Sequence, residues 1–323
     1  MTIGIDLGGT NLRAAAFDGE RMVAQHREPV GEPRDPATVV ASIARIVEQL
    51  APDGASVGVG IAAMLRDNRG TVANSPHLRW RDVAFGELLA ARLGARYPLG
   101  VYNDVNAITW GEVCAGAARG CRDVLGVYVG TGIGAGVVCN GQLVEGASHC
   151  AGELGHMKVR WDERAAPCAC GQRGCIEAYV GGSYLQARIV RELSAGKARF
   201  GHHARFPATT ALDYAGGIEH ITASHVDRAA GEGDAWALAL WGDVAPLLAI
   251  ALGNAIAVLN PERLVLGGGV LAHCPTLFEL VAAALEVAAP AASLEPLDVV
   301  AAELGDDAGL VGAARLAATS SRR

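Results

Sequence analysis

The sequence has few charged residues, and it has no uninterrupted hydrophobic run long enough to cross a bilayer. Of its 323 residues, 19% are charged and 51% are hydrophobic, which is typical of a folded globular protein. The longest apolar region, residues 244–259, is broken by Pro246, Gly253 and Asn254. The first residues have no basic run ahead of an apolar stretch, as a signal peptide would. We therefore expect a cytoplasmic protein that is not bound to membranes.

An excess of basic residues is also lacking. The net charge is −7, whereas proteins that hold nucleic acid through its phosphates carry a basic surface. We therefore expect no nucleic-acid partner. The length allows a large core and predicts two lobes or domains.

Several common nucleotide-binding signatures are missing. No G-x-x-x-x-G-K-[ST] motif occurs, which excludes a P-loop protein. No H-R-D or D-F-G pair occurs, which excludes a protein kinase. Residues 58–63 loosely match the dinucleotide-binding fingerprint, but the turn-forming residues 67–70 leave little room for the helix that it requires.

The two halves of the chain open on the same pattern, which is strand, glycine turn, strand. In the first half, residues 2–9 and 12–17 fit this pattern, and residues 22–27 predict a third strand of a meander. In the second half, residues 123–129 and 135–139 repeat it. Two related α/β lobes that face each other across a cleft would explain the repetition.

The remaining elements complete two lobes. We expect a smaller lobe over residues 1–118, completed by a helix within 308–323, and a larger lobe over residues 119–307. Residues 197–224 are poor in pattern and predict a loop or a loosely structured insertion. Helical patterns cover residues 35–50, 84–93, 105–118, 221–230, 235–259, 276–287 and 308–318, and strand patterns cover 56–62, 100–102, 142–145, 263–266 and 297–300.

The first glycine turn carries groups that suit a phosphate. Asp6 ends a strand, Gly8 and Gly9 let backbone amides approach an anion, and Thr10 and Asn11 add polar side chains. Asp6 is positioned to hold a hydrated Mg²⁺ near phosphates. An ordinary hairpin turn is the alternative interpretation.

Two further glycine turns fit the same interpretation. Gly130, Thr131 and Gly132 follow the first strand of the second half, so that two turns would grip a phosphate from both sides. A strand also runs into Gly268 and Gly269, which predicts a site at the edge of a nucleotide. A tight strand-to-helix turn would give the same residues.

Asn103 and Asp104 stand where a predicted strand leads into a predicted helix. Asp104 at such a position is either the N-cap of the helix or a carboxylate that accepts a proton from a substrate hydroxyl.

The most specific pattern is a set of metal-ligand residues, which are His156, Cys168, Cys170 and Cys175. Three thiolates and one imidazole suit tetrahedral zinc, and four protein ligands leave no open position, which predicts a structural ion. Unliganded buried cysteines are the alternative.

Two acids flank this set. Glu153 and Glu177 would present carboxylates to hydroxyl groups, or they are surface acids without a role.

Together these motifs resemble the signatures of the ROK family of bacterial sugar kinases and sugar-responsive repressors. The motifs occur in the family's order over residues 6–270: Asp6-Leu-Gly-Gly-Thr10, Asn103-Asp-Val-Asn-Ala107, Gly130-Thr-Gly-Ile-Gly134, Glu153-Leu-Gly-His156 and Cys168-Ala-Cys-Gly-Gln-Arg-Gly-Cys-Ile-Glu177. The resemblance implies the two-lobed actin and hexokinase-like (ribonuclease H-like) ATPase fold. It also implies homodimers or homotetramers.

The resemblance implies a role for each matched residue. Asp104 would be the general base, and Asn103, Glu153, His156 and Glu177 would bind the sugar. The first two glycine turns would hold the ATP phosphates, and Gly268 and Gly269 would lie near the adenosine. Because the first motif begins at Asp6, we expect the kinase branch rather than the repressors with an amino-terminal DNA-binding domain.

The expected reaction is transfer of the ATP γ-phosphoryl group to a hexose, with the 6-hydroxyl of glucose as first choice. N-acetylmannosamine, N-acetylglucosamine and fructose remain alternative acceptors, polyphosphate remains an alternative donor, and a sensor without catalysis is a further alternative. Many relatives have Pro-Gly where this chain has Ala62-Ala63-Met64, and Asn where it has His77. Both stretches lie near the sugar in the family, so they bear on the choice of substrate.

Overall fold

The computed structural model describes residues 1–200 and 209–320, which form two compact units. Unit 1 comprises Met1–Val124, Gly136–Gly152 and Glu303–Arg323, and unit 2 comprises Leu125–Ala135 and Glu153–Ala302. Each unit is described by itself below.

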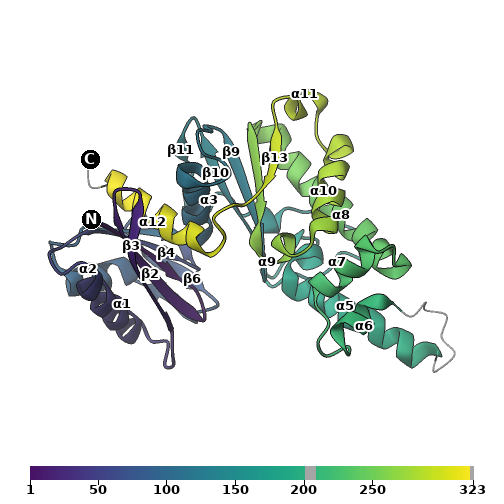
Figure 1. Ribbon diagram of the computed structural model, residues 1–323, viewed down its shortest axis with the longest axis horizontal. Coiled ribbons are helices and arrows are strands. Elements are labelled where there is room, and N and C mark those ends of the chain that lie inside the picture. Colours follow the sequence, from purple (N-terminus) through teal and green to yellow (C-terminus); the bar gives the residue numbers. More distant parts are fainter. Residues whose placement is uncertain (201–208, 321–323) are drawn as a thin grey trace. The chain divides into compact units, whose positions relative to one another are not determined.

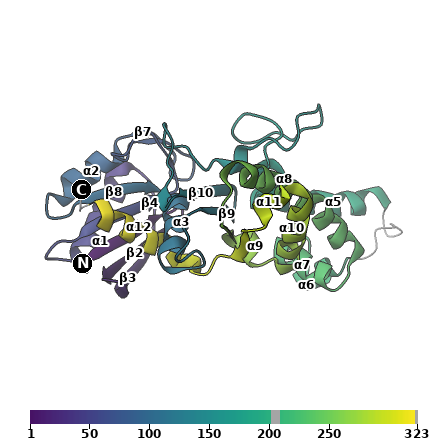
Figure 2. The same cartoon turned by 90° about the horizontal axis from the view of Figure 1, so that it is seen from above.

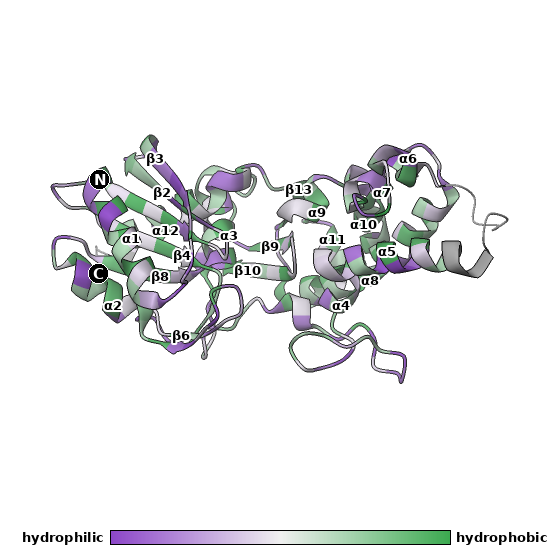
Figure 3. Ribbon diagram, turned by 90° about the horizontal axis from the view of Figure 1, so that it is seen from below, coloured by the Kyte–Doolittle hydropathy of each residue, from purple (hydrophilic) through white to green (hydrophobic). Residues whose placement is uncertain are grey.

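Unit 1 contains a five-stranded mixed sheet (Figure 1). Its strands, in spatial order, are β3 (Arg21–Pro29), β2 (Asn11–Asp18), β1 (Thr2–Leu7), β4 (Ser56–Ile61) and β8 (Leu99–Asn103). The first three form the predicted antiparallel meander, and β4 and β8 continue it in parallel. The edge strand β3 is largely hydrophilic, as Figure 3 shows, which suits its exposed position.

Helices cover both faces of this sheet (Figure 1). On one face, Ile3, Ile5 and Leu7 share a buried core with α1 (Pro36–Leu50) and α2 (Phe85–Leu93). The other face carries α3 (Asp104–Ala115) and α12 (Ala308–Ser320).

Helix α12 lies unusually close to the sheet because glycines face it. A Cβ atom added at Gly4 would lie 1.9 Å from the carbonyl oxygen of Leu310, and one added at Gly58 would lie 1.9 Å from that of Ala313. Only glycine leaves room for such an approach. The small residues of the last helix therefore serve to bring its backbone onto β1 and β4.

A small antiparallel sheet in unit 1 was not anticipated from the sequence. It consists of β5 (Met64–Leu65), β6 (Val72–Ser75) and β7 (Trp80–Val83). Strands of two to four residues are too short for an alternating pattern to stand out.

The second five-stranded sheet has the order β11-β10-β9-β12-β13. Its strands are β9 (Val124–Val129), β10 (Ile133–Cys139), β11 (Gln142–Leu143), β12 (Arg263–Gly267) and β13 (Asp298–Ala301). All six residues of β9 are buried, and β12 pairs with β13 in parallel, so both sheets combine parallel and antiparallel strands as in α/β folds.

The α-helices of unit 2 all fall within residues 177–294 (Figure 2). They are α4 (Glu177–Val180), α5 (Gly182–Phe200), α6 (Thr210–Ala215), α7 (Ala223–Gly231), α8 (Ala235–Leu259), α9 (Gly268–Ala272), α10 (Pro275–Ala288) and α11 (Ala291–Leu294). The buried carboxylate of Asp227 in α7 accepts hydrogen bonds from Trp241 Nε1 and from the first amides of α10, at Thr276 and Leu277.

The prediction that residues 197–224 form a loop is wrong for most of the described part of this segment. Helix α5 continues to Phe200, and α6 forms where the Thr209 side chain accepts a hydrogen bond from the amide of Ala211. Gly216 ends α6 in a left-handed conformation. A Thr cap and a Gly stop were present, but they enclose only six residues, which is too short a pattern to predict a helix. Residues 201–208 lie outside the described residues.

Within the described residues, one helix is long and apolar enough to cross a membrane, α8. However, 56% of its most apolar window is buried inside the protein. The core helices of water-soluble proteins pass the same test of length and composition. Helix α8 is a core element here, with Trp241, Leu248 and Leu252 fully buried.

Candidate functional site

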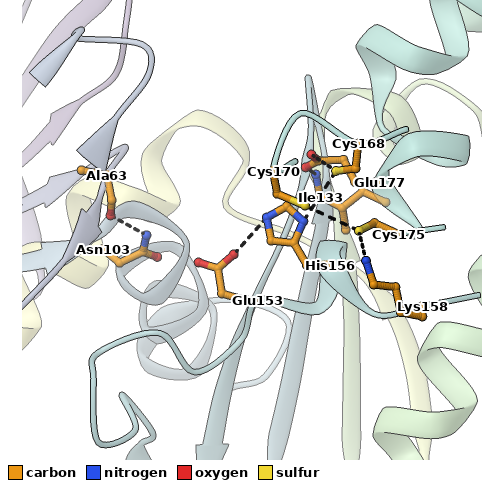
Figure 4. A network of polar contacts seen from close by, with 10 residues as sticks. All are labelled: Ala63, Asn103, Ile133, Glu153, His156, Lys158, Cys168, Cys170, Cys175 and Glu177. Carbon is orange, nitrogen blue, oxygen red and sulfur yellow. Dashed lines mark hydrogen bonds and ion pairs between the residues drawn. The ribbon is translucent and has the colours of Figure 1, made fainter. Parts of the chain in front are cut away.

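The four predicted metal ligands lie together in unit 2 (Figure 4). One ligand atom each from His156, Cys168, Cys170 and Cys175 lies within 4.8 Å of every other. Nδ1 of His156 is 3.8 Å from Sγ of Cys168, and Sγ of Cys170 is 3.7 Å from Sγ of Cys175. These soft donors, which are separated in sequence and convergent in space, can hold a metal ion.

Two tyrosines from the following helices fix the loop that carries the cysteines. The hydroxyl of Tyr179 accepts a hydrogen bond from the amide of Ala166 at 2.7 Å, and that of Tyr184 accepts one from the amide of Ala169 at 2.6 Å. The loop is therefore held in place from α4 and α5.

The cysteines differ in their electrostatic surroundings. Burial raises the pKa of the Cys168 thiol to about 11, whereas the amide of Gln172 lowers that of Cys170. Nζ of Lys158 donates to Sγ of Cys175 at 3.0 Å. Lys158 was not predicted from the sequence, because its partner lies 17 residues away and no local pattern encodes the contact.

The two flanking acids lie beside the metal ligands. Oε2 of Glu153 is 3.6 Å from Nε2 of His156, and burial raises the pKa of Glu153. Oε1 of Glu177 is 3.9 Å from Sγ of Cys168, and its Oε2 accepts a hydrogen bond from the amide of Ile133 at 2.9 Å. Nδ1 of His156 faces Cys168, and Nε2 faces Glu153. One ring nitrogen can therefore bind a metal while the other faces a carboxylate.

The second glycine turn also belongs to unit 2 and connects β9 to β10. The amide of Gly130 donates to the carbonyl of Gly132 at 3.0 Å. The amides of Gly182 and Ser183, at the start of α5, donate to the carbonyls of Gly130 and Thr131 at 2.8 and 3.0 Å. The turn is thus bonded to the start of a long helix.

The first glycine turn, in unit 1, connects β1 to β2 and borders a hollow of about 280 Å³. The lining is wholly polar or glycine: Asp6, Gly8, Gly9, Thr10, Asn11, Arg13, Arg27 and Asp306. All five residues predicted from the motif therefore line one hollow that has the polarity a phosphate requires.

Asp6 does not stand alone in this hollow. Nε and Nη2 of Arg13 donate to Oδ2 of Asp6 at 3.0 and 2.5 Å, and Nη1 of Arg13 lies 3.0 Å from Oδ2 of Asp306. Burial raises the pKa of Asp6 despite the opposing effect of Arg13. Arg13 was missed, although a three-residue turn places it opposite Asp6 in the hairpin.

Asn103 and Asp104 stand where β8 meets α3 in unit 1. The N-cap is Asn103, whose Oδ1 accepts from the amide of Asn106 at 3.1 Å, and Asp104 is the first residue of the helix. The alternative that Asp104 is the cap is therefore wrong. Nδ2 of Asn103 donates to the carbonyl of Ala63 at 3.2 Å (Figure 4), so the stretch that departs from the family pattern contacts this residue.

His77, the second departure, lies against the first glycine turn. A Cβ atom added at Gly9 would lie 2.7 Å from Cβ of His77. His77 therefore packs against one of the residues that line the hollow.

Gly268 and Gly269 begin the short helix α9, directly after β12. Gly268 has φ +84° and packs on the backbone of Val129, whereas the position of a Cβ at Gly269 is open. The structure therefore has a tight turn from strand to helix at these glycines, and Gly269 faces open space.

Known proteins resemble the chain over its full length. A glucokinase of Streptomyces coelicolor is 31% identical over 322 residues, which cover 98% of this chain and 97% of that protein. An N-acetyl-D-glucosamine kinase of Yersinia pseudotuberculosis is 30% identical over 335 residues, which cover 98% of each. A crystal structure of a ROK family glucokinase from Streptomyces griseus, in complex with glucose and AMPPNP, is 30% identical with a TM-score of 0.78, over 98% of this chain and 99% of that one.

These findings confirm the predicted fold class, an α/β fold of the actin and hexokinase-like type with two five-stranded mixed sheets. The sequence model of the ROK family matches residues 2–320. The chain belongs to the ROK family.

Proposed function

We propose that the protein transfers the γ-phosphoryl group of ATP to a hydroxyl of a hexose, and that glucose, through its 6-hydroxyl, is the substrate. The observation that carries the proposal is Asp104 at the start of α3, beside a cap that Asn103 supplies. The glucokinases among the relatives support glucose, and the N-acetyl-D-glucosamine kinase supports N-acetylglucosamine as the second candidate.

The acceptor is bound by polar groups that surround its hydroxyls. Asp104 orients the attacking hydroxyl and takes its proton as general base. The residues proposed to bind the other hydroxyls are Asn103, Glu153, His156 and Glu177. Within unit 2, the separation of 3.6 Å between His156 and Glu153 supports a pair of polar groups that contacts neighbouring hydroxyls.

The donor is held at the two glycine turns. Backbone amides there offset the charge that develops on the transferred group. We assign the phosphates to Gly8, Gly9, Thr10, Asn11, Gly130, Thr131 and Gly132, and the adenosine to Gly268 and Gly269. Asp6 and Asp306 supply the oxygen ligands that Mg²⁺ prefers, and Mg²⁺, when bound, would neutralise phosphate charge. Before the donor binds, the guanidinium of Arg13 compensates the negative charge of both carboxylates.

Zinc is the metal that fits the cluster of His156 and the three cysteines. Thiolate and imidazole donors favour it, and four protein ligands complete a tetrahedron. The ion would be structural, because no coordination position remains for substrate. Self-association into dimers or tetramers stays a prediction of the family resemblance, and a cytoplasmic location stays a prediction from the amino-acid sequence.

The test is a panel of glucose, N-acetylglucosamine, N-acetylmannosamine and fructose in a coupled assay of ADP release, with ATP and with polyphosphate as donor. Asp104→Asn should lower kcat by about 100-fold or more and leave the calorimetric affinity for glucose near that of the wild type. Asp53→Asn, at an exposed loop position, is the matched control and should change neither. Wild-type turnover in Asp104→Asn would overturn the assignment of the base, and absence of turnover with every sugar would favour a sensor.

A further inference from the structure

We propose that Glu177 is a positioning residue for the phosphoryl donor: it ties the metal loop, residues 156–175, to the donor turn, residues 130–134. The bound metal would then set the affinity for ATP as well as the position of the sugar-binding groups. The inference rests on the proposed function, in which the donor turn binds the phosphates.

The carboxylate of Glu177 touches both segments. Its Oε2 accepts the amide hydrogen of Ile133 at 2.9 Å, and its Oε1 is 3.9 Å from Sγ of Cys168 (Figure 4). A Cβ atom added at Gly132 would lie 2.4 Å from Oε2, so the carboxylate occupies the space that any larger residue would need. Only Ile176 separates Glu177 from the metal ligand Cys175.

The backbone that follows Glu177 continues the same contact. Gly182 and Ser183 donate to the carbonyls of Gly130 and Thr131. Together with the bond from Ile133, three hydrogen bonds join residues 130–133 to residues 177–183. The segment that leaves the metal loop therefore runs along the donor turn.

This arrangement lowers the cost of binding an anion. A turn with glycines at positions 130, 132 and 134 has much conformational freedom to lose, and a turn that is already fixed loses less on binding. A bound metal would cross-link three cysteines and a histidine next to Glu177 and would thereby hold the carboxylate in place. Without the metal, the loop and with it the donor turn should become less ordered.

The experiment measures binding and not only turnover. Calorimetry of a non-hydrolysable ATP analogue and, separately, of glucose is carried out on zinc-loaded wild type, Glu177→Gln and Glu177→Ala, with zinc content checked. We expect Glu177→Ala to bind the analogue about tenfold more weakly or worse, because a hydrogen bond to a charged group is lost at the turn. Glu177→Gln, which can still accept the amide of Ile133, should keep most of the affinity.

Because Glu177 is also proposed to contact the sugar, a second variant disturbs the same contact from the side of the turn. Gly132→Ala keeps Glu177, but its added Cβ would lie 2.4 Å from Oε2, so it should weaken the analogue and accelerate exchange of residues 130–134 as Glu177→Ala does. Gly242→Ala, whose added Cβ meets nothing within 4 Å, is the control for the glycine substitution itself. In the wild type, removal of zinc should weaken the analogue, and in Glu177→Ala this dependence on zinc should disappear.

Hydrogen exchange of residues 130–134 gives a readout that needs no nucleotide. Exchange should accelerate in Glu177→Ala and after chelation of zinc from the wild type. Analogue affinity within twofold of the wild type in zinc-loaded Glu177→Ala, or unchanged protection of the turn, would overturn the inference. If the wild type binds no ATP analogue at all, the proposed donor fails, and the exchange data alone decide whether Glu177 orders the turn.

Discussion

Glu112 is a buried carboxylate of α3 that joins segments far apart in the sequence. Its side chain is fully buried, and it accepts hydrogen bonds from the amides of Ala117 at 2.8 Å and Leu304 at 2.9 Å. A further amide, that of Glu303, lies 3.1 Å from it. These contacts fix α3, which begins with Asp104, to the segment that leads into α12. We expect Glu112→Ala to destabilise the protein strongly.

The size of the effect follows from the burial and from the number of donors. One hydrogen bond to a charged group contributes about 1.5–3 kcal/mol, and a buried donor left without a partner costs about 1–3 kcal/mol. The contributions are not additive, because water can enter the space that the side chain vacates. Removal of one partner from a buried charged network costs about 3–5 kcal/mol, and we expect Glu112→Ala to lower the free energy of unfolding by that amount.

Urea denaturation followed by tryptophan fluorescence measures this loss, with zinc concentration held constant. Glu48→Ala is the matched control, because the carboxylate of Glu48 pairs with Arg92 at 3.0 Å on the surface and should contribute no more than about 1 kcal/mol. A loss below about 1 kcal/mol in Glu112→Ala, with an unchanged m value, would refute the reasoning, since it would mean that water satisfies the amides as well as the carboxylate does.

Three further predictions concern the charged groups near the two sites. Lys158→Met should weaken metal affinity about 10–100-fold through loss of the bond to Cys175, whereas Lys158→Arg should retain most of it; the rate of zinc transfer to a chromophoric chelator checks this. Cys170 is exposed and has a lowered pKa, so it should be alkylated fastest after zinc removal and should be protected when zinc is present. Cys274 is buried and its pKa is raised to about 12, so it should not react in either state. If the metal assignment is wrong, mass spectrometry would show the same alkylation rate for Cys170 with and without zinc. Burial raises the pKa of Asp6, so protonation of Asp6 stabilises the folded state: this contribution to the free energy of unfolding is complete below the unfolded pKa of about 4 and is lost as pH rises through the higher folded pKa. The free energy of unfolding of the wild type, measured relative to that of Asp6→Asn, should therefore fall with rising pH. A difference that is flat or rises would contradict this.

Much of the fold was predictable because its long elements carry strong periodic or apolar patterns. The meander of β1 to β3, the amphipathic helix α1 and the apolar helix α8 all lie where the sequence placed them. The small sheet of β5 to β7 and the helix α6 were missed because each is shorter than the window in which a period becomes visible. The failure is therefore one of length, since the turn residues that bound α6 were present.

The candidate site was predictable to the extent that its chemistry lies in local motifs. The four predicted metal ligands have a sequence spacing and a set of donor atoms that are typical of a zinc site, and their ligand atoms lie within 4.8 Å of one another. The hydrogen bond from Ile133 to Glu177 joins residues 44 positions apart, and no local pattern encodes it. The cap at Asn103 was not resolved either, because both Asn103 and Asp104 are good capping residues.

The two glycine turns share a device that the motifs alone did not reveal. At each turn, a carboxylate is held by a donor of the chain itself: Asp6 by the guanidinium of Arg13, and Glu177 by the amide of Ile133. An acid with no such donor would repel an anionic phosphate and would be free to rotate away. In the proposed function, each carboxylate is oriented before a ligand arrives, and Arg13 also offsets the charge of Asp6, so that glycine amides and nearby acids can be combined at one turn. The acids beside the glycines would then be part of the proposed donor sites, and we expect the donor affinity of each turn to depend on the contact that Arg13 or Ile133 makes with its acid.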